Sequence, residues 1–175
     1  GMILKRRPDI DPFLAKPDPA MRATLIYGRD RGVVRERGEQ LARALVPNID
    51  DPFDTALLTD GDLEADPARL EEELAAQSML GGKRLVRLRP AGEKASVDRL
   101  AAEALVAPLD GRLNPDAGLV IEAGNLGRDS ALRKAAEKGD AAWVIPCYED
   151  EVGDIARMTR EALRADNVSL SSEAL

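Results

Sequence analysis

The chain has 175 residues, of which 44% are hydrophobic and 33% charged, and its net charge is -7. This length and composition allow a buried core, while the acidic balance argues against broad electrostatic binding to nucleic acid or to an anionic membrane surface. The sequence contains no histidine, the commonest general base and metal ligand. Its single cysteine, Cys147, can form no internal disulfide, and no stretch has the length of a membrane span or the pattern of a signal peptide. We therefore expect a cytoplasmic protein without membrane contacts.

The opening segment, residues 3–22, contains prolines at positions 8, 12, 17 and 19. Proline lacks an N–H group and restricts both its own backbone and that of the residue before it. We therefore expect extended segments here and one short turn of helix. The turn is expected around three apolar residues, which are Ile10, Phe13 and Leu14.

From residue 24 onward, short apolar runs alternate with amphipathic segments. The apolar runs predict five strands, at residues 24–28, 55–59, 84–89, 119–123 and 142–145. The amphipathic segments predict helices whose starts are marked by capping residues, namely Asp30, Asp66 followed by Pro67, Ser96 and Ser130. Strands that alternate with helices favour right-handed crossovers. The predicted fold is an α/β domain over residues 2–148, with a parallel five-stranded sheet and helices on both faces.

Residues 149–175 have a different pattern. Apolar side chains recur at helical spacing between Val152 and Leu163, with no strand after them, and residues 171–173 have the signature of another helix start. We expect the beginning of a helical second domain here, cut short at residue 175.

The loop after the first strand has the position of a phosphate-binding P-loop but not its residues. Counted from Gly28, the second glycine, the lysine and the Ser/Thr of that motif fall on Val33, Val34 and Arg35, while Gly32 comes one position early. The lysine that would hold the terminal phosphates and the hydroxyl that would bind Mg²⁺ are therefore missing. We interpret the loop as a degenerate nucleotide site and expect no bound nucleotide, metal or other cofactor.

Charged residues on two of the predicted strands allow a catalytic and a structural interpretation. Glu122 could act as a base at a strand end, but without partners at a readable spacing a polar strand-end residue is the favoured interpretation. The arginines Arg84, Arg87 and Arg89 could contact an acidic partner. A solvated face interleaved with the glutamates of residues 71–73 is the favoured interpretation of this run.

The segment Gln77-Ser78-Met79-Leu80, followed by two glycines, joins a predicted helix to the third strand. We expect the helix to end here, because glycine after a helical run is the usual left-handed C-cap. Met79 and Leu80 would then lie on a surface turn. Two interpretations remain open: the pair makes the hydrophobic contact of the C-cap, or it is an exposed plug for a pocket on another protein.

Taken together, these residues resemble the N-terminal part of the delta subunit of the bacterial DNA polymerase III clamp loader. The resemblance lies in four segments that follow one another in the family's order, at residues 25–37, 78–86, 130–134 and 145–148. It implies an AAA+-type fold with a decayed nucleotide site, a small helical second domain, and a C-terminal collar domain that these residues lack. It also implies a subunit of the DNA-directed DNA polymerase holoenzyme with no catalytic site of its own. In DNA replication, such a subunit binds the sliding clamp and opens one interface of that ring for loading onto DNA.

In that family, an apolar pair at the end of a helix enters a hydrophobic pocket on the clamp, which is the beta subunit of DNA polymerase III. The resemblance places this role on Met79 and Leu80, with Gln77 and Ser78 as flanking contacts. The family often has Leu-Phe where this chain has Met-Leu, so an aromatic ring is lost from the contact. Further implied partners are the other clamp-loader subunits in the full-length protein, and DNA only within the assembly.

A function from another class remains as the alternative. The chain could be an active nucleotide-dependent P-loop enzyme, or an α/β domain that binds a small molecule at the carboxyl ends of its strands. The missing lysine and Ser/Thr of the degenerate loop argue against it.

Overall fold

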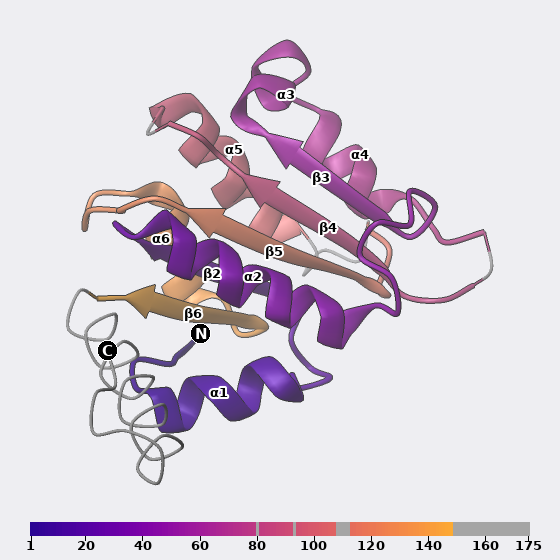
Figure 1. Ribbon diagram of the computed structural model, residues 1–175. Coiled ribbons are helices and arrows are strands. Elements are labelled where there is room, and N and C mark those ends of the chain that lie inside the picture. Colours follow the sequence, from indigo (N-terminus) through magenta and orange to yellow (C-terminus); the bar gives the residue numbers. More distant parts are fainter. Residues whose placement is uncertain (80, 93, 108–112, 149–175) are drawn as a thin grey trace, which may run out of the picture.

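The computed structural model describes residues 1–79, 81–92, 94–107 and 113–148, which form a six-stranded sheet with helices on both faces (Figure 1). The strands are β1 Met2–Ile3, β2 Ala23–Gly28, β3 Thr55–Thr59, β4 Arg84–Arg89, β5 Ala117–Ala123 and β6 Ala142–Cys147. The helices are α1 Arg7–Ala15, α2 Arg31–Leu45, α3 Asp60–Ala65, α4 Arg69–Ala75, α5 Ala95–Val106 and α6 Ala131–Lys138. The predicted helical second domain, residues 149–175, lies outside the described residues.

Every neighbouring pair of strands is parallel, and the order across the sheet is β1-β6-β2-β5-β4-β3. The predicted parallel sheet and its five strands are confirmed. The sixth strand, β1, was not predicted. It has two residues, which pair with Trp143 and Val144 at the free edge of β6. Two residues are too few to show a periodic pattern, so this strand becomes visible only when the edge that it joins is known.

The sheet separates two hydrophobic cores. In Figure 1, α2 crosses in front of the sheet and α5 lies behind it. The core under α1 and α2 contains Ile10, Leu14, Ile26, Leu41, Val120 and Ile145, among others. The core on the other face, under α3 to α6, contains Leu25, Leu58, Leu70, Leu88, Ile121 and Leu132, among others. Successive residues of β2 and β5 alternate between these cores, as side chains on a pleated strand must.

Two of the four predicted helix starts are confirmed by capping hydrogen bonds. The Asp30 carboxylate accepts a hydrogen bond from the backbone N–H of Val33 at 3.1 Å, and the Ser130 hydroxyl accepts one from Arg133 N–H at 3.1 Å. The opening helix α1 is longer than the predicted turn. It spans nine residues, because Pro8 stands in its first turn, where a missing N–H costs nothing.

The other two predicted starts are wrong. Residue 66 ends the short helix α3 instead of beginning α4, which starts at Arg69. Helix α3 was not predicted, and its N-cap is Thr59 in a capping box with Asp62. Helix α5 begins after Lys94, so Ser96 lies inside its first turn rather than capping it.

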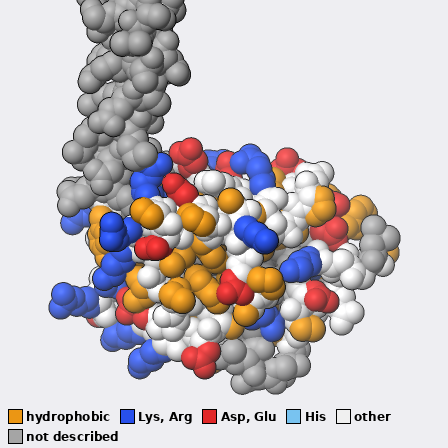
Figure 2. Space-filling view, turned by 90° about the horizontal axis from the view of Figure 1, so that it is seen from below, with side chains coloured by type: hydrophobic (Ala, Val, Ile, Leu, Met, Phe, Trp, Pro, Cys, Tyr) orange, Lys and Arg blue, Asp and Glu red, His pale blue; other side chains and the backbone are white. Residues whose placement is uncertain are grey.

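Hydrophobic side chains remain exposed at both edges of the sheet. Met2 and Ile3 of β1 are 54% and 41% exposed, and Leu57 of β3 is 49% exposed. The face seen from below in Figure 2 has hydrophobic side chains near its centre and Lys and Arg gathered towards one side. Among the described residues, no helix is both long enough and apolar enough to span a bilayer.

Candidate functional site

Side chains of the protein itself occupy the loop after β2 that we interpret as a degenerate nucleotide site. The Asp30 carboxylate caps α2 and places a negative charge where a P-loop would hold phosphate. Val34 is 2% exposed and belongs to the core under α2. Arg35 donates a hydrogen bond to Glu39 at 3.2 Å, which lowers the pKa of that carboxyl group. Val34, at the lysine position of the motif, therefore packs in the core, and Arg35, at the Ser/Thr position, forms an ion pair along the helix.

Gly28, the first of the two glycines of this loop, has a structural explanation. A Cβ atom on Gly28 would lie 2.5 Å from the carbonyl oxygen of Cys147, so the close approach of β6 requires glycine here. A Cβ atom on Gly32 would lie 3.2 Å from Oδ1 of Asp30. Gly28 therefore needs no bound phosphate to account for its presence, whereas the contact at Gly32 is with a side-chain atom that can move.

Arg31 bridges the carboxyl-end edge of the sheet, where parallel α/β proteins usually bind their ligands. Its guanidinium group donates to the carbonyl oxygens of Pro90 at 3.2 Å and Ala91 at 3.0 Å, just beyond β4. A Cβ atom on Gly124, just after β5, would lie 2.9 Å from Nη2 of Arg31. An arginine of α2 thus covers part of the crevice beside the loop.

A buried ion cluster lies between α2 and the sheet. The Glu122 side chain is 1% exposed, and its Oε2 accepts hydrogen bonds from Nε and Nη2 of Arg87 at 3.1 and 2.9 Å. Its Oε1 accepts from Arg89 at 3.4 Å. The favoured interpretation of the arginines as a solvated face was wrong, whereas Glu122 does lie near the end of β5 as a polar residue. A carboxylate enclosed in this way is not placed to act as a base on an external substrate.

The third arginine of β4 is also buried. Arg84 is 8% exposed and forms an ion pair with Glu73 of α4. The alternation of charged and apolar residues in β4 therefore does not separate a solvent-exposed face from a buried one. Both faces of this strand are covered, and its arginines are buried because acidic or carbonyl partners meet them there.

Gly38 lies directly over the ion cluster. A Cβ atom on this residue would come within 2.4 Å of Cδ and 2.5 Å of Cγ of Glu122, whereas non-bonded carbon atoms pack at about 3.5–4.0 Å. Helix α2 can thus cross β5 this closely only at a residue without a side chain.

We expect Gly38→Ala to lower the free energy of unfolding by about 1–3 kcal/mol, although alanine is the better helix former. The added methyl group must displace either Glu122 or α2. Urea denaturation measures the change. Gly118→Ala in β5 is the matched control, because a Cβ atom there has no atom within 4 Å. If Gly38→Ala were as stable as wild type, α2 would be able to move away from β5 without a loss in the free energy of unfolding.

Helix α4 ends at Ala75, before the segment in which it was expected to end. The side chain of Asn114 donates a hydrogen bond to the carbonyl oxygen of Ala76 at 2.9 Å. The backbone N–H of Asn114 donates to the carbonyl oxygen of Leu74 at 3.2 Å. Carbonyl groups at the end of the helix thus find partners in a loop distant in sequence rather than in a glycine C-cap. Residues 77–79 follow the helix as a loop.

The predicted partner-binding residues lie in this loop. Gln77 is exposed, Ser78 is 8% exposed and Met79 is 83% exposed, while Leu80 lies outside the described residues. The N–H of Gly81 donates to the carbonyl oxygen of Ser78 at 3.1 Å, so the chain reverses between these two residues. Gly81 has a φ of +74°, which glycine adopts without strain. We call the described residues of this segment, 77–79 and 81, the Met79 turn.

A hydrogen bond of Ser78 holds the Met79 turn on the body of the protein, and Arg84 joins the segments beside it. The Ser78 hydroxyl donates to Oδ1 of Asp54 at 2.6 Å. Nε of Arg84 donates to the Glu73 carbonyl at 2.9 Å, and Nη1 donates to the Phe53 carbonyl at 3.1 Å. Ser78 is thus an anchor of the turn, and Met79 is the apolar side chain that the described part of the turn presents to solvent. Sequence reasoning found the exposed residue but had no signal for the anchors.

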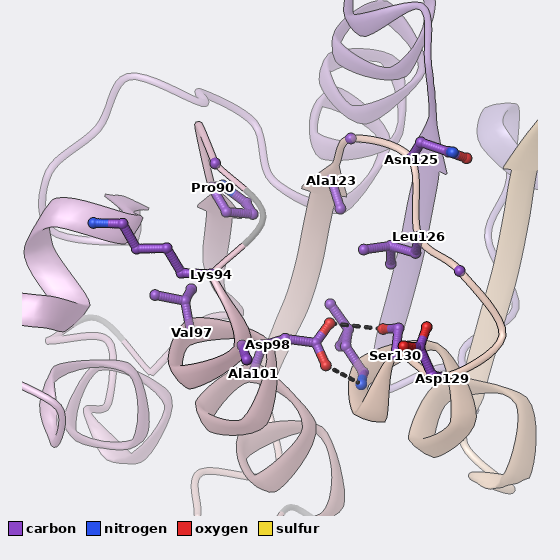
Figure 3. Close-up of a pocket in the computed structure, with 15 residues that line it drawn as sticks. Pro90, Lys94, Val97, Asp98, Ala101, Ala123, Asn125, Leu126, Asp129 and Ser130 are labelled. Carbon is purple, nitrogen blue, oxygen red and sulfur yellow. Dashed lines mark hydrogen bonds between the residues drawn. The ribbon is translucent and has the colours of Figure 1, made fainter.

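A cavity of about 290 Å³ opens at the carboxyl ends of β4 and β5, between α5 and α6 (Figure 3). In Figure 3, the Asp98 carboxylate points across it to the start of α6, where it accepts hydrogen bonds from the Ser130 hydroxyl at 2.6 Å and from Leu132 N–H at 3.0 Å. Asp129 also lines the cavity. Asp98 is thus already used to cap α6, and two carboxylates disfavour a phosphate ligand. This cavity was not predicted, because its walls come from elements that are separate in the sequence.

The strand order and the covering helices define the class of the fold, a parallel α/β domain with helices on both faces of the sheet. Among solved structures, the chain is similar to the DNA clamp loader delta protein of Bacillus subtilis. The TM-score is 0.63 and the identity 18%, over 91% of this chain and 47% of that one. It is also similar to a DNA polymerase III gamma subunit-related protein of Thermotoga maritima, with a TM-score of 0.48 and 15% identity, over 84% of this chain and 48% of that one.

The similarity to the Bacillus subtilis protein confirms the predicted fold class, with six strands instead of five. At this identity it shows the shared fold alone. The chain spans about half the length of each of these two proteins. No family model matches the chain, and no curated protein matches it.

Proposed function

We propose that this chain is part of a non-catalytic clamp-loader subunit of the delta type, which binds the DNA sliding clamp through the Met79 turn and opens one interface of the ring. The observation that carries the proposal is the Met79 side chain, 83% exposed on a turn whose neighbouring residues are fixed by hydrogen bonds. The fold shared with a clamp loader delta protein and the sequence resemblance support it.

The proposed contact is hydrophobic and partly preorganised. Burying a methionine side chain in an apolar pocket contributes about 1.5–3 kcal/mol. Because Ser78, the residue before Met79, is already held by its hydrogen bond to Asp54, less backbone freedom is lost on binding. Leu80 is the second proposed anchor, and Gln77 contributes a polar contact at the rim. Ser78 acts by holding the turn.

Ring opening requires no chemistry by this chain. The closed ring is one state of an equilibrium, and a partner shifts that equilibrium only by binding the open state more tightly. The Met79 turn anchors the contact, and α4 and the exposed Lys83, just before β4, press against the adjacent clamp surface. Other clamp-loader subunits and DNA are proposed partners of the full-length protein, within the assembly.

The test uses the cognate sliding clamp loaded on closed circular DNA. An excess of this chain, without ATP, is expected to bind the clamp and to increase the rate at which it leaves the DNA. Tight binding without faster unloading would show a protein that grips the ring but does not open it. The absence of binding would remove the proposal altogether.

We further expect the chain to bind neither ATP nor ATP with Mg²⁺. Asp30 occupies the helix start, Val34 is buried, and Arg31 is bonded to backbone carbonyl groups beside the loop. A ligand that binds the folded state raises the melting temperature, so a thermal shift assay detects binding and calorimetry measures its affinity. A protein with an intact P-loop serves as positive control. Micromolar binding would favour the alternative, a nucleotide-dependent enzyme or a small-molecule-binding α/β domain.

A further inference from the structure

A second large apolar side chain lies close to the Met79 turn. Phe53 is 67% exposed and stands in the loop between α2 and β3, at the end of the sheet where the strands begin. In Figure 1, this loop and the segment that enters β4 lie at the same end of the sheet, to the right. Neither of the two hydrophobic cores includes the Phe53 ring.

One hydrogen bond ties the Phe53 loop to the Met79 turn, and Arg84 ties the same loop to the end of α4 that precedes the turn. The hydrogen bond of 2.6 Å between Ser78 and Asp54 joins the residue before Met79 to the residue after Phe53. Arg84, 8% exposed, donates to the carbonyl oxygen of Phe53 at 3.1 Å and, through Nε, to the last turn of α4. The neighbours of Phe53 and Met79 in the sequence are therefore in direct contact.

The Phe53 loop has a fixed backbone. The Asp51 side chain accepts a hydrogen bond from Phe53 N–H at 2.9 Å, and the Asp51 carbonyl accepts from the Thr55 N–H at 2.9 Å and from the Thr55 hydroxyl at 2.6 Å. Such side-chain and backbone bonds define a tight turn. The exposed ring is thus held in place by the fold rather than carried on a loose segment.

We propose that Phe53 is a second anchor for the sliding clamp and enters apolar clamp surface next to the pocket that takes Met79. This inference rests on the proposed function. The clamp is the expected partner because Asp54, next to Phe53, is hydrogen-bonded to Ser78, next to Met79, so a partner bound at Met79 also reaches Phe53. Aromatic residues are enriched among interface anchors. Phe53 also provides, from another loop, the ring that the Met79 and Leu80 pair lacks.

The experiment compares Phe53→Ala, Met79→Ala and the double variant with wild type for equilibrium binding to the cognate clamp at fixed salt. Tyr148→Ala is the matched control, because Tyr148 is an aromatic residue 47% exposed just beyond β6, at the opposite end of the sheet. Circular dichroism verifies that each variant is folded. Phe53→Ala is expected to weaken binding on the order of tenfold, and Phe53→Leu is expected to retain most of the affinity.

The outcomes separate this inference from the proposed function. Weaker binding by the Phe53 and Met79 variants, with Tyr148→Ala unchanged, supports both. If Met79→Ala weakens binding while Phe53→Ala binds like wild type, the second anchor is refuted and the proposed function stands. If Tyr148→Ala weakens binding as much as Phe53→Ala, the effect is not specific to this surface and the inference fails. If wild type does not bind the clamp, the proposed function fails first.

Discussion

Replacing Glu122 by alanine is expected to lower the free energy of unfolding by about 3–5 kcal/mol. The carboxylate is 1% exposed and is the partner of Arg87, whose side chain is 6% exposed. Removing it leaves a buried guanidinium group without its counter-charge, and the lost attraction is large because water does not reach the site. A loss of this size is a large fraction of the stability of an ordinary domain.

Urea denaturation at neutral pH measures this loss, and two further variants identify its cause. Arg87→Met combined with Glu122→Leu removes both charges and retains apolar volume, so its stability is expected to lie much closer to wild type. Arg89, 24% exposed, can then turn towards solvent. Glu122→Gln keeps the shape but not the charge and is expected to fall between these variants. A loss below about 1 kcal/mol for Glu122→Ala would place the cluster in the class of weak surface ion pairs.

The second large effect concerns the proposed clamp contact. Replacing both Met79 and Leu80 by alanine is expected to weaken clamp binding by at least about 2 kcal/mol, roughly thirtyfold. The change removes the apolar side chains proposed to enter the clamp pocket. The melting temperature is expected to stay nearly constant, because Met79 is 83% exposed and exposed side chains contribute little to folding.

Met2→Ala is the control for this pair of substitutions. Met2 is also an exposed methionine, at 54%, but it stands on β1 at the opposite edge of the sheet from β3. Its replacement is expected to leave clamp binding unchanged. If the Met79 and Leu80 variant instead unfolds, the pair belongs to the hydrophobic core, and the interpretation as an exposed plug is refuted.

The parts of this protein that the sequence predicted depend on short-range signals. Apolar runs of about five residues predicted the five long strands, and the capping oxygens of Asp30 and Ser130 predicted the starts of α2 and α6. The degenerate loop was also visible in the sequence, because a P-loop motif is read over eight consecutive residues. Each of these signals acts within one element or its immediate flanks, where chain connectivity alone brings the groups together.

Groups far apart in the sequence decided the rest. Glu122 and Arg87 are 35 residues apart and meet only because β4 and β5 are neighbours in the sheet. Asn114 ends α4 from 38 residues away, and the bond between Ser78 and Asp54 spans 24 residues. A buried charge is stable only when an opposite charge or a carbonyl group lies next to it. A run of arginines is therefore predicted to be solvated as long as its partners are unknown. Composition and periodicity thus determined the elements of this chain, whereas strand order determined which charges are buried and placed Phe53 beside the Met79 turn.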